Sequence, residues 1–245
     1  MNLNEQRPLG REPIPGIPPA YRLFFQESMR SLGLTASLLP SSRYLAAALL
    51  RPIDFRRART IVELGPGTGA ITSAILRRLR PDAKLFAIDI NQTFVNHLRE
   101  TCDDPRLIPL CGCATELSSL LAPYDSEPVS AVVSSLGLTT MDPRTRTLVM
   151  RAIKARLAPG GAMTQYQYVH ASAGLLDIPK LKFSRFNEAD FLRSFFQDVS
   201  VGHVILNFPP AFVFTCQISS FSRPGRGLLI NASGSLMIDT TEPSR

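Results

Sequence analysis

The length, composition and charge of the chain limit the classes of protein to which it can belong. With 245 residues, of which 44% are hydrophobic and 19% charged, it can form one α/β domain with a complete core, or that domain and a small appendage. The apolar runs are too short to cross a bilayer, and the start of the chain lacks the order of a signal peptide, so we expect a cytoplasmic protein. The four cysteines and three histidines have no metal-ligand or disulfide spacing, and we predict no metal site.

The net charge of +7 comes from 23 arginines and 4 lysines against 20 acidic residues. Such a balance suits an anionic partner, and both a nucleic acid and an anionic bilayer surface fit this description. An arginine-rich surface that is simply solvated is the alternative. Charge alone therefore leaves three interpretations open.

Strand-like and helix-like patterns alternate along the middle of the chain. Residues 1–19 are rich in proline, and we expect a flexible lead-in there. One domain is expected at 20–221, with helices at 20–52 and the core at 60–218. A flexible tail is expected at 222–245. We expect strands at 60–64, 84–88, 107–110, 129–135 and 162–168, with helices between them, the last from Arg144 to Leu157. This alternation predicts a mostly parallel sheet with helices on both faces.

The end of the core breaks this alternation. Val199–Leu206 and Ala211–Ile218 read as two strands, and the four residues between them cannot hold a crossover helix. We therefore expect an antiparallel hairpin at the end of a Rossmann-like sheet. The intervening Asn207-Phe208-Pro209-Pro210 is similar to a box found in amino-group methyltransferases, but that box follows the fourth strand, so here we interpret it as a structural turn.

The stretch VELGPGTGAI (62–71) predicts a nucleotide-binding loop. Its glycines allow a ligand to approach the backbone and the start of the next helix, and Asp89, 20 residues after Gly69, can accept ribose hydroxyls at the end of the second strand. Glu63, two residues before Gly65, would repel a pyrophosphate but would attract a cationic sulfonium. Together with the terminal hairpin, these residues resemble a class I S-adenosylmethionine-dependent methyltransferase.

Several further stretches resemble the bacterial phospholipid N-methyltransferases, which methylate phosphatidylethanolamine stepwise to phosphatidylcholine. That family has patterns close to G-A-V-x-P-S-S, V-V-S-G-L-P-L, Q-F-T-Y and N-L-P-P-A. In this chain the first pattern corresponds to a stretch that ends in Pro40-Ser41-Ser42. The second and third correspond to VVSSLGL (132–138) and QYQY (165–168), and the fourth corresponds to NFPPA (207–211) at the hairpin turn. Gly137, Gln167 and Cys113 depart from the family's residues at their positions.

The resemblance implies roles for particular residues. Cofactor binding is assigned to Ser41, Ser42, Glu63, Gly65, Gly67, Gly69, Asp89, Ile90, Cys113, Ala114 and Ser134. Ser135 and Leu136, with Ser134, would present oxygen atoms to the acceptor ammonium, and Tyr168 would orient the amine and face its methyl groups. The serines at 41 and 42 could equally be helix caps, and Tyr168 could equally be a packed core aromatic.

The segment before the core bears on membrane binding. Apolar and basic residues fall close to helical spacing, and such a helix can lie in the headgroup region of an anionic bilayer. The candidate docking residues are Tyr21, Arg22, Phe24, Phe25 and Met29. We accordingly expect peripheral association with the inner face of the membrane, although the same helix could simply cover the cofactor cleft.

Other activities remain open at this point. A ribosomal RNA adenine dimethyltransferase would explain the basic charge, but Leu138 stands where an aromatic should stack the target base, and no RNA-binding domain follows the core, so nucleic acid is the less favoured partner. Methylation of another amine lipid, such as an ornithine lipid, and a methyltransferase-like protein without turnover are further alternatives. The number of methyl groups added and the oligomeric state are not specified by the sequence.

Overall fold

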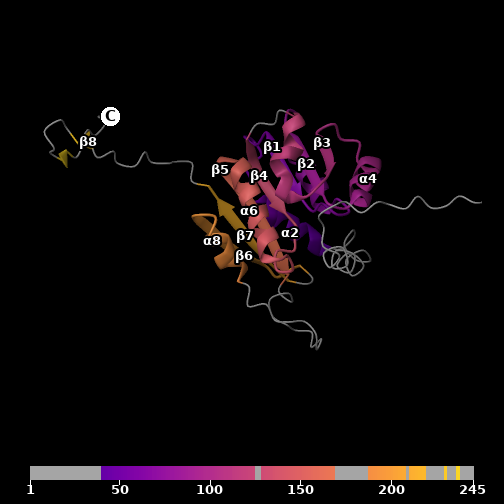
Figure 1. Ribbon diagram of the computed structural model, residues 1–245. Helices are drawn as coiled ribbons and strands as arrows, with labels where there is room; N and C mark the ends of the chain where they lie inside the picture. The colour runs from indigo at the N-terminus through magenta and orange to yellow at the C-terminus, as the bar shows by residue number, and fades with distance from the viewer. Residues whose placement is uncertain are drawn as a thin grey trace, which may run out of the picture.

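The fold is known from a computed structural model, which describes residues 40–124, 128–168, 187–207 and 210–218, with the backbone of 229–230 and 236–237. Side chains are described from residue 43 onward. A twisted sheet forms the centre of the described part, and helices cover its two faces (Figure 1). The lead-in expected at 1–19, the helices expected at 20–39 and most of the tail lie outside these residues.

Seven strands form the central sheet in the order β3-β2-β1-β4-β5-β7-β6. Their bounds are β1 Thr60–Leu64, β2 Lys84–Asp89, β3 Leu107–Cys111, β4 Val129–Ser134, β5 Leu157–Tyr168, β6 Asp198–Val204 and β7 Ala211–Gln217. The first five strands are parallel, and β7 runs antiparallel to both β5 and β6. The expected fold class, a mostly parallel Rossmann-like sheet ending in an antiparallel hairpin, is confirmed.

The helices divide into two layers, each with its own apolar cluster. Their bounds are α2 Pro40–Leu50, α3 Ala70–Leu76, α4 Gln92–Thr101, η1 Ala114–Glu116, α5 Leu117–Leu121, η2 Ala122–Tyr124, α6 Pro143–Arg156 and α8 Glu188–Arg193. Helices α2, α3 and α4 pack on one face, and α5, α6 and α8 on the other. Along β1, Ile61 faces the first layer while Val62 and Leu64 face the second, so the strand is buried on both faces.

Several elements begin or end one or more residues away from the expected positions; β3, for example, extends to Cys111 and α6 begins at Pro143. Strand β5 begins at Leu157 rather than Ala162, because Leu157 already pairs with Val129 before an irregular segment that includes Gly160 at a φ of 74°. Helix α6 accordingly ends at Arg156. Strand β4 ends at Ser134, one residue early.

The hairpin strands also end earlier than expected. Val204 is the last residue of β6, because its partner Ala211 is the first residue of β7 and nothing pairs with the positions between them. Ile205 and Leu206, which we expected to continue the strand, therefore lie in the turn. Beyond the core, β8 (Leu229–Ile230) and β9 (Leu236–Met237) form a two-residue antiparallel pair within the expected tail.

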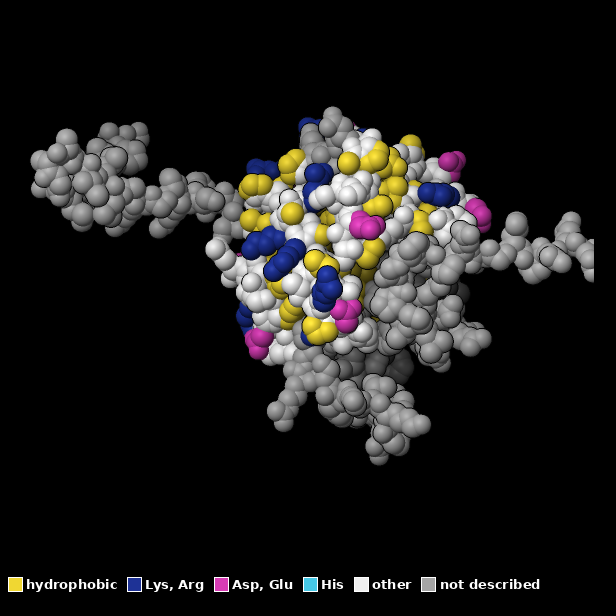
Figure 2. Space-filling view, viewed as in Figure 1, with side chains coloured by type: hydrophobic (Ala, Val, Ile, Leu, Met, Phe, Trp, Pro, Cys, Tyr) yellow, Lys and Arg dark blue, Asp and Glu magenta, His cyan; other side chains and the backbone are white. Residues whose placement is uncertain are grey.

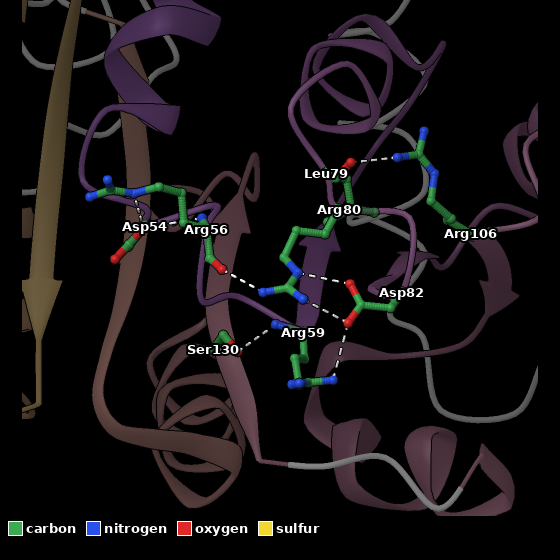
Figure 3. A network of polar contacts seen from close by, with 8 residues as sticks. All are labelled: Asp54, Arg56, Arg59, Leu79, Arg80, Asp82, Arg106 and Ser130. Carbon is green, nitrogen blue, oxygen red and sulfur yellow. Dashed lines mark hydrogen bonds and ion pairs between the residues drawn. The ribbon is translucent and has the colours of Figure 1, made fainter.

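Several arginines form ion pairs and hydrogen bonds between the loops at the amino edge of the sheet (Figure 3). Arg59, just before β1, and Arg80, after α3, both pair with Asp82, at 3.2 and 2.8 Å. Arg80 also donates to the carbonyl of Arg56 at 2.6 Å, and Arg106 donates to the carbonyl of Leu79. These contacts tie together the loops that lead into β1, β2 and β3, so several arginines have structural partners at the edge opposite the carboxyl ends of the parallel strands.

We predict that α2 is an integral part of the core. Leu49 of α2 is fully buried in the apolar cluster, so Leu49→Ala should lower the free energy of unfolding by about 2–5 kcal/mol. Leu148 of α6 is 42% exposed, and the matched control Leu148→Ala should change it by about 0.5 kcal/mol or less. Urea denaturation followed by circular dichroism measures both. Equal small effects would show that α2 does not contribute to folding stability.

Candidate active site

The carboxyl ends of β1, β2, β4 and β5 meet at one edge of the sheet, where ligands bind in open α/β folds. The glycine-rich loop leaves β1 here and leads into α3. Gly65, Gly67 and Gly69 all have positive φ, at 73°, 54° and 86°. The loop therefore follows a path that other residues adopt only with strain.

Gly69 is required for two independent reasons. It precedes α3 in the left-handed conformation, and a Cβ atom placed on it would lie 2.7 Å from Cδ2 of Leu98 in α4. A side chain here would thus strain the backbone and would displace the Leu98 side chain.

Glu63 is buried at the end of β1 with one oxygen atom unused. Its Oε2 accepts a hydrogen bond from Thr72 Oγ1 of α3 at 2.6 Å, whereas Oε1 is buried without a partner among the described residues. Burial raises the pKa of this carboxyl group to about 7; the Thr72 hydrogen bond opposes that effect and the nearby Asp89 adds to it. A cationic ligand would stabilise the ionised form.

Asp89 is buried at the end of β2 and organises the loop around it. Its Oδ1 accepts the backbone N–H of Asn91 at 2.8 Å, and its Oδ2 accepts that of Gly67 at 3.3 Å. Burial raises its pKa to about 6, against the effect of these hydrogen bonds. A carboxylate has about four lone-pair sites, so acceptor capacity remains for the hydroxyl groups of a ligand.

The end of β3 lies next to Asp89. The backbone N–H of Gly112 donates to the Asp89 carbonyl at 3.0 Å, and the Cys111 thiol lies 3.8 Å from the carbonyl of Ile90. Cys113 and Ala114, expected at the adenine, follow directly as the start of η1. The predicted cofactor residues at the end of β3 therefore follow directly on the backbone contact between Gly112 and Asp89.

The loop after β4 brings the predicted acceptor residues beside the glycine loop. Ser135 donates its backbone N–H to the carbonyl of Leu64 at 2.8 Å, and the buried Ser134 hydroxyl accepts the N–H of Leu136 at 3.4 Å. The Leu136 carbonyl already accepts from Nε2 of Gln165 at 2.7 Å and from the N–H of Leu138 at 3.0 Å. Its lone pairs are used within the protein, which favours Ser135 over Leu136 as a contact for an ammonium group.

Two tyrosines lie side by side at the end of β5. The ring centroids of Tyr166 and Tyr168 are 5.2 Å apart with planes at 70°, and both rings pack against the cluster that includes α2. Burial raises both phenol pKa values, and the neighbouring Tyr168 raises that of Tyr166 further, while a contact from Ser135 lowers it. Ser135 Oγ is buried and forms no hydrogen bond of ordinary length and angle with the described residues, so this last contact is weak.

Tyr166 was not among the residues predicted from the sequence. Its signal was its position two residues before Tyr168 in a strand, which places both side chains on the same face. Other oxygen atoms are buried without partners among the described residues: Thr164 Oγ1, on the same face of β5 as Tyr166, Gln165 Oε1, on its opposite face, and, on other elements, Glu63 Oε1 and Ser135 Oγ. Such acceptors suit a ligand that brings N–H or O–H donors.

Other predicted site residues lie beyond what the structure describes. The backbone of Ser41 and Ser42 forms the first turn of α2, but their side chains are not described, and Tyr21, Arg22, Phe24, Phe25 and Met29 fall outside the described range. Within the described ranges, no group of three histidine, cysteine, aspartate or glutamate side chains could hold a metal ion. No helix in that part of the chain is long and apolar enough to cross a membrane.

Comparison with known proteins identifies the family. The family model for a methyltransferase domain matches residues 61–161. An ornithine lipid N-methyltransferase from Singulisphaera acidiphila is 30% identical over 183 residues, which cover 74% of this chain and 88% of that protein. The chain belongs to the S-adenosylmethionine-dependent methyltransferases. The expected enzyme class, an S-adenosylmethionine-dependent N-methyltransferase, and the expected cofactor are confirmed.

Solved structures support the fold of this methyltransferase. A Burkholderia thailandensis 1,6-didemethyltoxoflavin-N1-methyltransferase with bound S-adenosylhomocysteine matches 89% of the chain and 98% of its own, with a TM-score of 0.60 and 18% identity. The N-methyltransferase NodS from Bradyrhizobium japonicum, also in complex with S-adenosylhomocysteine, covers 81% and 98%, with a TM-score of 0.60 and 13% identity. At these identities the likeness concerns the fold.

Glu63 should make cofactor binding depend on pH. Because its pKa is raised to about 7, the affinity for S-adenosylmethionine should rise about tenfold between about pH 5 and pH 8, as the carboxylate forms beside the cation. Glu63→Gln cannot ionise and should lose most of this rise. Isothermal titration calorimetry on both proteins measures it, and the variant corrects for titration of the cofactor itself. Identical pH profiles would place the cation away from Glu63.

The same ionisation should affect stability in the absence of cofactor. Between the ordinary pKa of 4.5 and about 7 the folded protein binds more protons than the unfolded chain, so stability falls as pH rises through that range. Glu63 should account for about 3 kcal/mol of this loss, so the loss should be smaller by that amount in Glu63→Gln. Asp89 and Glu188, whose pKa values burial raises to about 6 and about 8, keep their own contributions in both proteins. Urea denaturation of both proteins at several pH values tests this, and parallel curves would contradict it.

Proposed function

We propose that this methyltransferase transfers the methyl group to the primary amine of a membrane amine lipid, with an ornithine lipid as the first candidate acceptor. The observation that carries the proposal is the relative whose stated substrate is an ornithine lipid, with which the chain aligns over most of both lengths. The hydroxyl groups at the end of β5 are compatible with an ammonium headgroup.

Phosphatidylethanolamine is the second candidate. The sequence analysis placed it first, because the PSS, QYQY and NFPPA stretches resemble phospholipid N-methyltransferases. A relative of stated activity now outweighs those short motifs, so the order of the two lipids changes. Both headgroups present a primary ammonium, and the same reacting geometry serves either one.

The cofactor residues divide into two roles in this proposal. Glu63 would face the positive charge of the bound S-adenosylmethionine, which supplies the electrophilic methyl group, and Asp89 would accept the ribose hydroxyls. Ile90, Cys113 and Ala114 would line the adenine. The protein's contribution is to hold the acceptor nitrogen in line with the methyl group.

The acceptor amine must lose a proton before it can attack. For an amine of pKa near 10, this costs about 4 kcal/mol at neutral pH. The raised pKa values of Tyr166 and Tyr168 keep both phenols neutral, so they would act as hydrogen-bond partners of the amine and not as phenolate bases. Ser135 adds a third neutral hydroxyl, and the Tyr168 ring would face the methylammonium product.

Methyl transfer to three acceptors offered in parallel tests the proposal. Purified protein receives labelled S-adenosylmethionine with vesicles containing ornithine lipid, vesicles containing phosphatidylethanolamine, or small-subunit ribosomal RNA. Label in ornithine lipid supports the first candidate, and label in phosphatidylethanolamine alone supports the second. Label in RNA alone would overturn the lipid proposal and make the arginine-rich surface a nucleic-acid contact.

Replacing Tyr168 should affect the acceptor and not the cofactor. Tyr168→Phe removes one hydrogen-bond partner of an ammonium, so kcat/KM for the amine lipid should fall about 10–100-fold, while the Kd for S-adenosylmethionine stays unchanged. Tyr124→Phe, at a tyrosine of η2 that packs against Phe86 on the other face of the sheet, is the matched control and should leave both quantities unchanged. An unaltered kcat/KM in Tyr168→Phe would make Tyr168 a packing residue.

A further inference from the structure

The first residues of the turn between β6 and β7 expose two apolar side chains and bury a polar one. Ile205 and Leu206 are 78% and 68% exposed, more than any other large hydrophobic residue of the described ranges. The next residue, Asn207, is only 5% exposed. This inverts the usual arrangement, in which a turn presents polar residues to water, and an exposed apolar cluster commonly marks an interaction site. We call Ile205 and Leu206 the aliphatic tip.

The aliphatic tip lies at the same edge of the sheet as the candidate active site. Val204, the residue before the tip, pairs with Ala211 of β7, and Ala211 pairs on its other side with Tyr168. The tip therefore begins one residue beyond the row that contains Tyr168. With strands about 4.8 Å apart, it is two strands away from the residue we place against the acceptor amine.

An aromatic and a cationic side chain lie toward the same edge. The C-terminal end of α2 leads into the amino-edge loops, so its first turn lies toward the opposite edge of the sheet. Leu45 of α2 belongs to the same apolar cluster as Val204. That turn carries Arg43, whose guanidinium lies 5.0 Å from the ring centre of the half-exposed Tyr44. Arginine and tyrosine are suited to the headgroup region of a bilayer.

Charge alone does not mark a docking surface on the view shown in Figure 2. Apart from a small group left of the centre, the lysine and arginine side chains there are scattered among hydrophobic, acidic and uncharged ones. Several other arginines are paired at the amino edge, as described above. Docking by that edge would also turn the active site away from the surface, so a lipid-binding surface is expected at the carboxyl edge.

We propose that the aliphatic tip is a membrane-docking element, which inserts Ile205 and Leu206 into the headgroup region of the bilayer and so brings the Tyr168 end of the site to the lipid. The proposal rests on the proposed function, because a lipid acceptor must be reached at the bilayer surface. Two aliphatic side chains are too small for a stable protein interface, which buries about 800 Å² on each side. They are sufficient for shallow insertion helped by nearby basic residues.

The test separates docking from catalysis. The full chain, the double variant Ile205→Ser/Leu206→Ser and the control Leu148→Ser, which removes a half-exposed leucine from α6, are sedimented with vesicles of phosphatidylcholine and phosphatidylglycerol. These vesicles contain no amine lipid, so binding cannot reflect capture of an acceptor. The double variant should bind about tenfold more weakly, and the control should bind as the unaltered protein does.

Methyl transfer is measured on the same three proteins, with ornithine lipid in vesicles and dispersed in detergent. The double variant should lose activity about tenfold on vesicles and keep it in detergent. Unchanged vesicle binding would overturn the docking proposal even if the lipid is methylated. The docking proposal would also be overturned if the unaltered protein does not bind vesicles but self-associates, and if the double variant abolishes that self-association. Ile205 and Leu206 would then form a contact between copies of the chain. Failure to methylate any lipid would overturn the proposed function, while sedimentation still decides the docking.

Discussion

The burial of two carboxyl groups at the carboxyl ends of β1 and β2 is the constraint on which the rest of the site depends. Glu63 is the next-to-last residue of β1 and Asp89 the last of β2, and burial raises the pKa of each. Thr72 and the backbone of the glycine loop satisfy only part of their acceptor capacity. The fold therefore keeps two carboxyl groups whose ionised forms are favoured once a cation with hydroxyl groups is bound, which is the chemistry of S-adenosylmethionine.

Sequence patterns predicted the sheet well, because burial on both faces makes each parallel strand a continuous apolar run. Strand β1 has the bounds expected, and the short link before Ala211 forced the hairpin. The ends of strands were less predictable, since they depend on which residues of the neighbouring strand are available for pairing. Strand β5 starts early because Leu157 pairs with Val129, and β6 ends at Val204 because its partner strand β7 starts at Ala211. Propensity along a single strand contains no information about where its neighbour ends.

The residues of the candidate site also differed in how far the sequence could identify them. Glu63 and Asp89 could be identified from the sequence, because both lie within or next to recognisable strand and loop patterns. Tyr166 could not, because its role follows from packing beside Tyr168 and from the approach of Ser135 across the sheet. Leu136 was expected to offer its carbonyl, and only the structure revealed that Gln165 already occupies it. Hydrogen-bond competition between distant segments is invisible to a motif.

In the proposed arrangement the two halves of the sheet have separate roles, which would allow one fold to serve different acceptors. Most of the predicted cofactor residues belong to β1, β2 and the loops that follow β1 and β3, whereas the tyrosines that we place against the acceptor and the aliphatic tip belong to β5 and the β6–β7 hairpin. Changes in the second group can alter the acceptor or the approach to a membrane without disturbing the buried carboxyl groups. Solved methyltransferases with a TM-score of 0.60 but 13–18% identity illustrate that the framework persists while most side chains change. Substrate identity must therefore be sought on the hairpin side of the sheet.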